Sequence, residues 1–114
     1  MNQHYPNLLS KIDEMADGDQ DFKSQLTRAI KSGMEELKQK YEEGMIQSNE
    51  MIIQQVRHKV KPTLMLFGFD DLIEFLNEGK VILESEGFGP SFNAHAKQVS
   101  GQLEKAIAQL HSLE

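Results

Sequence analysis

Apolar residues recur at every third or fourth position along most of the chain, which is the period of an amphipathic helix. Four long stripes of this kind span residues 19–43, 52–67, 72–83 and 92–110, and a shorter one comprises Leu8, Leu9, Ile12 and Met15. No segment alternates apolar and polar residues as a half-buried strand does. The pattern therefore predicts an all-α fold: an antiparallel four-helix bundle with a short additional N-terminal helix.

Glycines and polar residues between the stripes indicate where helices end. Gly44 follows the first long stripe at a position where helices often stop. Ser48 or Asn49 then has the right side chain to cap the next helix. Gly68 separates the second and third long helices, and Gly79 is expected to weaken the middle of the third.

Composition narrows the class of protein. The chain of 114 residues suits one domain covering residues 1–114, and it has no cysteine, so disulfides and thiolate chemistry are excluded. A net charge of −6 disfavours general binding to nucleic acid or anionic membranes. No apolar run is long enough to span a bilayer, and the first residues lack a signal-peptide pattern. We therefore expect a cytoplasmic protein, and a monomer.

Candidate chemistry centres on one histidine. On a helical wheel with about 100° per residue, His58 falls at about 200° from Val56, nearly opposite the apolar stripe. Lys61 and Gln54 lie one turn away on the same side, and Met65 completes this outer row. An exposed imidazole beside a lysine ammonium is suited to carrying an anion.

The other three histidines are weaker candidates. His95 falls at the edge of the last apolar stripe, where we expect a packed or half-buried side chain. His111 is near the chain end, and His4 lies in what we expect to be a loose terminus. No histidine has the helical spacing to another ligand that a zinc motif such as H-E-x-x-H requires. No metal site is predicted.

The residues around His58 follow a known order. The chain reads His58, Lys59, Val60, Lys61, Pro62 and Thr63, followed by Gly68. This stretch resembles the motif H-x-L-K-G-[ST], with a further glycine, of histidine-containing phosphotransfer (HPt) domains in two-component phosphorelays. The segment DDLIEFLNEG is similar to the family's following helix, and GDQDF to the start of its long preceding helix. The resemblance covers residues 15–85.

The resemblance implies a phosphoryl carrier. His58 would attack the aspartyl phosphate of a receiver domain, belonging to a response regulator or hybrid kinase, and hold the group as a phosphoramidate. Neutral imidazole is a competent nucleophile for this step. Lys61 would compensate phosphoryl charge, and Gln54 either hydrogen-bonds the group or is ordinary surface. The chain needs no cofactor of its own, because the magnesium ion belongs to the receiver. Without an ATP-binding signature, it is a carrier more than an enzyme.

The resemblance also implies a docking surface and two motif positions. The expected docking residues are Arg57, Lys59, Pro62, Met65 and Leu66. Thr63 and Gly68 occupy structural positions of the motif, where Gly68 serves packing or a turn, or simply caps the helix. The chain departs from the family in having Arg57 where a small residue is common and Pro62 where glycine is usual.

Pro62 leaves alternatives open. In a helix it frees the carbonyl of His58 and presents little bulk, which preserves a partner's close approach. It also biases the backbone of Lys61 away from the helical region. One alternative is therefore a receiver-docking adaptor that is never phosphorylated. Another is a structural or oligomeric helical bundle, for which the apolar stripes suffice.

Overall fold

The computed structural model describes residues 4–114, and residues 1–3 of the expected domain lie outside this range. Its described part is all-helical and contains no strand. The five helices are α1 (Leu8–Ala16), α2 (Gln20–Gln47), α3 (Glu50–Leu66), α4 (Asp70–Ser85) and α5 (Pro90–Ser112). The prediction of an all-α fold with four long helices and a short N-terminal one is confirmed at this level.

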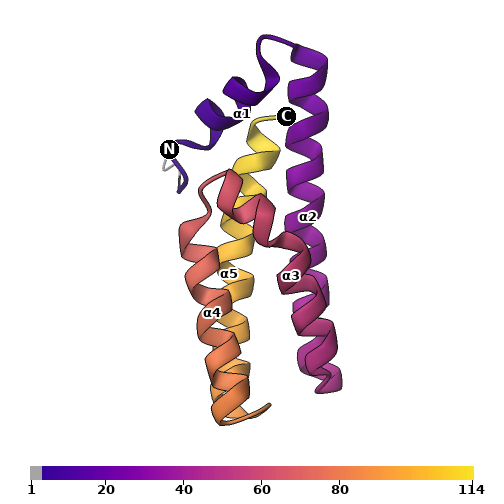
Figure 1. The fold of residues 1–114 in the computed structure, drawn as a ribbon, viewed down its shortest axis with the longest axis vertical. Helices are drawn as coiled ribbons and strands as arrows, with labels where there is room; N and C mark the ends of the chain where they lie inside the picture. The colour runs from indigo at the N-terminus through magenta and orange to yellow at the C-terminus, as the bar shows by residue number, and fades with distance from the viewer. Residues whose placement is uncertain (1–3) are drawn as a thin grey trace.

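The helices pack lengthwise into a bundle (Figure 1). The longest helix, α2, contacts α3 and α5, and α4 contacts the same two helices. The short α1 packs against α2 near one end of the bundle. The resulting shape is elongated, with extents of 47 × 27 × 18 Å. Within the described residues, no helix combines the length and apolar character that crossing a membrane requires.

The apolar stripes meet in one core. Burying an aliphatic or aromatic side chain contributes about 1.5–3 kcal/mol, so this core is the main source of stability. Its largest fully buried side chains are Phe69, Phe92, Leu8, Ile12, Met34, Leu37, Ile53, Leu64, Leu72, Leu103, Leu110 and Val99. Phe22 and Leu66 stay 42% and 54% exposed, so they add little to this core.

The turn between α2 and α3 differs from the sequence expectation. Gly44 does not end α2, which continues to Gln47. Gly44 is instead buried, and a Cβ there would lie 2.6 Å from Cδ1 of Ile53, so the glycine allows α2 and α3 to approach closely. Ser48 then takes the left-handed conformation that ends α2. Asn49 caps α3, since its side chain accepts hydrogen bonds from the N–H groups of Met51 and Ile52.

Helix α3 continues through Pro62, as the unbroken apolar phase predicts. Pro62 has no N–H, so it cannot donate to the carbonyl of His58. The ribbon of α3 bends in its second half (Figure 1). After the helix, Gly68 has a φ of 75°, a left-handed conformation that favours glycine. Gly68 is therefore the turn residue between α3 and α4.

The N-terminal segment is held against the bundle. The hydroxyl of Tyr5 donates to the Asp71 carboxylate at 3.0 Å, and the amide of Gln102 donates to the same oxygen at 2.7 Å. The ring of His4 lies 3.1 Å from that oxygen. The expectation that His4 lies in a loose terminus is therefore wrong. Helical periodicity could not reveal these contacts because they join residues far apart in sequence.

Candidate functional site

His58 is exposed and lies in an open hollow between α3 and α4. The hollow has a volume of about 570 Å³ and is lined by Met51, Gln54, Gln55, Arg57, His58, Lys61, Asn77 and Lys80. The outward position that the helical wheel predicts for His58 is confirmed. The structure thus brings four of the predicted residues together at this hollow: Gln54, Arg57, His58 and Lys61.

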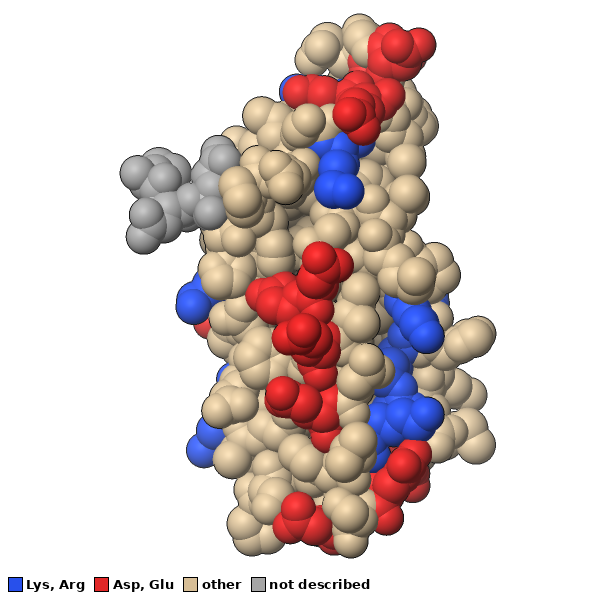
Figure 2. All heavy atoms as spheres, turned by 60° about the vertical axis from the view of Figure 1, so that its left-hand side comes forward, with Lys and Arg blue, Asp and Glu red and all other residues tan. Residues whose placement is uncertain are grey.

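The hollow is basic in a chain that is acidic overall. Arg57, Lys61 and Lys80 line it, and within residues 4–114 none of the three forms an ion pair with a carboxylate. No Asp or Glu is among its described lining residues. Figure 2 shows the wider charge pattern of one face, where a row of basic side chains runs beside a row of acidic ones. Three cations without neutralising partners favour binding of an anion.

Three side-chain amides supply hydrogen-bond donors to the same hollow. They belong to Gln54 and Gln55 on α3 and to Asn77 on α4. Gln54 also donates to the carboxylate of Glu50 over a long 3.5 Å, a weak bond that leaves its second N–H available. Oxyanions accept hydrogen bonds both from amide N–H groups and from cationic side chains, and this hollow offers both.

Exposed apolar side chains flank this basic hollow along α3. Met51 lines it and is 59% exposed. Further along the helix, Met65 is 61% exposed and Leu66 is 54% exposed. Methionine is adaptable in shape and recurs at surfaces that bind protein partners. Two of these three residues, Met65 and Leu66, belong to the predicted docking surface.

The remaining predicted residues lie away from the hollow. Lys59 pairs with Glu36 of α2 at 2.7 Å, on the side of α3 that faces α2. Thr63 is partly buried and lines the groove between α2 and α3. Pro62 is exposed outside the hollow's lining, and Gly68 serves the turn. The sequence motif therefore mixes residues that surround His58 with residues that serve the fold.

Four lining residues were not predicted: Met51, Gln55, Asn77 and Lys80. Asn77 and Lys80 have the i, i+3 spacing that places both on one outer face of α4. That spacing is readable from the sequence. Its relation to His58 is not, because periodicity gives a residue's angle on its own helix and not which helix lies beside it.

Next to this site, a hydrogen-bonded pair is buried in the core. The hydroxyl of Tyr41 on α2 lies 2.8 Å from Nε2 of His95 on α5. Burial raises the pKa of Tyr41, and the charge of Arg57 acts against this increase. Burial likewise lowers the pKa of His95, against an opposing effect of Glu78. His95 is only 4% exposed, so its predicted packed position is confirmed.

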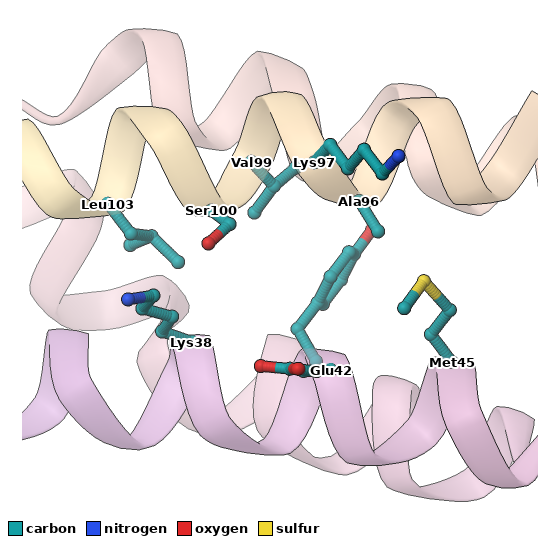
Figure 3. A pocket seen from close by; sticks show the side chains of 9 residues that line it. Lys38, Glu42, Met45, Ala96, Lys97, Val99, Ser100 and Leu103 are labelled. Carbon is teal, nitrogen blue, oxygen red and sulfur yellow. The ribbon is translucent and has the colours of Figure 1, made fainter.

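A second, smaller hollow lies between α2 and α5, beside Tyr41. It has a volume of about 210 Å³, and Figure 3 shows Lys38 on α2 and Lys97 on α5 among the residues that line it. Lys38 is already paired with Glu104 at 3.1 Å, and Glu42 also lines this hollow. Its charges are therefore largely balanced, in contrast to those around His58.

Searches among protein-family models, curated proteins and solved structures find no match to this chain. Within residues 4–114, no group of three or more histidine, aspartate or glutamate side chains is arranged to hold a metal ion.

Proposed function

We propose that this chain is a histidine phosphotransfer domain that reversibly accepts a phosphoryl group on His58. In this proposal α2, α3, α4 and α5 are the antiparallel four-helix bundle of the HPt family, and α1 is an addition to it. The partner is a receiver domain of a two-component pathway, which supplies the aspartyl phosphate and the magnesium ion.

One observation carries the proposal: exposed His58 shares a hollow with three cations that have no carboxylate partner within residues 4–114. A phosphoryl group on a ring nitrogen brings negatively charged oxygens beside the imidazole. Arg57, Lys61 and Lys80 can compensate this charge, and the amides can donate to the oxygens. An ordinary surface histidine would not require three cations without carboxylate partners beside it.

The proposed step balances without a further reactant. The lone pair on Nε2 of His58 attacks phosphorus, an N–P bond forms, and the P–O bond to the receiver's aspartate breaks. The aspartate carboxylate leaves with the bonding electron pair, and the ring passes its extra positive charge to solvent by losing the Nδ1 proton. In the reverse direction a receiver carboxylate attacks phosphorus and the N–P bond breaks. The chain contributes the nucleophile, its orientation and the neighbouring charges.

A receiver-docking adaptor is the second candidate. Pro62 favours it, because the family's usual residue there is glycine. The exposed side chains of Met65 and Leu66 suit docking whether or not His58 reacts. The two candidates share a partner and differ in whether the phosphoryl group reaches this chain.

Transfer from phosphorylated receivers separates the candidates. A panel of radiolabelled receiver domains is incubated with the wild-type chain, with His58→Gln and with His111→Gln. His111 is the matched control because it is also exposed, at the far end of the sequence from the motif. The proposal expects base-stable, acid-labile label on the wild type and on His111→Gln, and none on His58→Gln.

Receiver binding without label on any variant would support the adaptor and contradict phosphotransfer. Label that persists in His58→Gln would contradict the assignment of the acceptor. Binding is measured in the same panel by calorimetry, so that a lack of transfer can be distinguished from a lack of contact.

A further inference from the structure

We infer that Tyr41, His95 and Gly79 form a positioning element that holds Lys80 of the His58 hollow in place. The inference rests on the proposed function only in assigning a phosphoryl group as the anion. None of the three residues lines the hollow. They act through Lys80, which follows Gly79 in the chain and lines the hollow.

Three helices meet at this element. Tyr41 comes from α2 and His95 from α5, and their side chains are hydrogen-bonded at 2.8 Å. Gly79 on α4 faces both of them: a Cβ at this position would overlap the Tyr41 hydroxyl and lie 2.5 Å from Nε2 of His95. The backbone of α4 therefore rests directly on the hydrogen-bonded pair.

The element reaches the hollow through the backbone of α4. Lys80 follows Gly79 in α4 and lines the hollow, so the pair that supports Gly79 also sets where the backbone of Lys80 lies. Arg57 lines the hollow from α3, and its charge acts on the Tyr41 hydroxyl. The position of Lys80 thus depends on the buried pair through the backbone of α4.

Burial makes this arrangement specific. Tyr41 is 2% exposed and His95 is 4% exposed, so neither can exchange its partner for water without opening the core. A buried polar group that loses its partner is destabilised by about 1–3 kcal/mol. The pair is therefore held at one geometry, and α4 with it.

The test compares two conservative variants, Tyr41→Phe and Tyr5→Phe. Each removes one buried tyrosine hydroxyl that makes a hydrogen bond, to His95 in one case and to Asp71 in the other. Tyr5 belongs to the N-terminal segment and does not line the hollow, so Tyr5→Phe controls for a general loss of stability. The readout is the backbone amide resonances of Arg57, Gly79 and Lys80, together with affinity for sulfate, which keeps its charge near neutral pH.

The inference expects Tyr41→Phe to shift these three amide resonances and to weaken sulfate binding about fivefold, a coupling of ordinary size. Tyr5→Phe should leave both unchanged. Equal behaviour of the two variants, or unshifted resonances in Tyr41→Phe, would overturn the inference.

Failure of the proposed function gives a different result. If the wild type binds no sulfate, the hollow is not an anion site and the proposed function loses its main support. The amide resonance of Lys80 still decides whether the buried pair positions it.

Discussion

Lys80 of α4 lines the same hollow as His58 of α3, so two helices contribute to one basic site. Within residues 4–114, Lys80 has no carboxylate partner, in contrast to Lys38, Lys40 and Lys59. A lysine without an acidic neighbour has its positive charge available to attract a bound anion.

Removing the charge of Lys80 should weaken anion binding. Lys80→Ala is expected to lower sulfate affinity about threefold to fivefold, the effect of one exposed ion pair. Lys80→Arg should retain most of the affinity because the charge remains. Lys105→Ala is the control, since Lys105 is exposed on α5 and outside the hollow. Calorimetric titration with sulfate measures the affinity of the wild type and of the three variants. Equal losses of affinity in the two alanine variants would contradict the assignment of Lys80 to the anion site.

Gly79→Ala should destabilise the protein although alanine favours helices. The added methyl group would collide with the hydroxyl of Tyr41 and the ring of His95, at a cost of about 1–3 kcal/mol, against a helix-propensity gain of about 1 kcal/mol. Gly101→Ala in α5 is the matched control, because nothing lies within 4 Å of the new methyl group. It should stabilise the protein by up to about 1 kcal/mol. Urea unfolding gives both values, and stabilisation by Gly79→Ala would contradict the packing described.

His95 should make stability depend on pH. Its pKa is lowered in the fold from an ordinary value of 6.5, so the folded state favours the neutral ring. The stability contribution is therefore fully present above 6.5 and is lost as pH falls from 6.5 toward the lowered value. Burial of His95 causes this preference for the neutral ring, and the charge of Glu78 on α4 acts against it.

Unfolding free energy measured at about pH 7.5 and about pH 5 checks this dependence, in the range where histidine titrates. His95→Gln should be less stable at the higher pH and lose less stability on acidification than the wild type. His4→Gln is the comparison, because His4 is exposed beside Asp71. An unchanged pH dependence in His95→Gln would exclude His95 as the source.

Pro62→Ala should stabilise α3. The substitution restores an N–H that can donate to the carbonyl of His58, and Pro62 is exposed, so no core contact is lost. The gain in the helix, up to about 3 kcal/mol, is offset by about 1 kcal/mol from the freer unfolded chain. A higher urea midpoint with an unchanged slope is expected. A lower midpoint would mean that the bend at Pro62 is required for packing.

Much of the fold follows from the sequence because helical periodicity is local. The apolar stripes predict the five helices, and the wheel places His58 outward and His95 at the edge of its stripe, where a packed side chain is expected; the structure has His58 exposed and His95 buried. Asn49 is one of two predicted caps and is the one that accepts the amide hydrogen bonds.

Other features depend on contacts between helices and could not be predicted in this way. Gly44 is predicted to end a helix, but it lies inside α2, where the absence of a side chain leaves room for Ile53. Gly79 reads as a weak point, yet it makes room for Tyr41 and His95. Nothing in the sequence around Lys80 indicates that this lysine lies beside His58.

The central claim is that its surroundings make His58 a phosphoryl acceptor, and reaction with phosphoramidate tests this most directly. The small donor needs no partner protein and can reach every exposed histidine, so His58 and His111 compete within one molecule. Phosphorus NMR and peptide mapping follow each site with time. The account predicts that His58 is phosphorylated faster than His111 and that Lys61→Ala with Lys80→Ala removes this advantage. Equal rates at the two histidines, or faster reaction at His111, would contradict it.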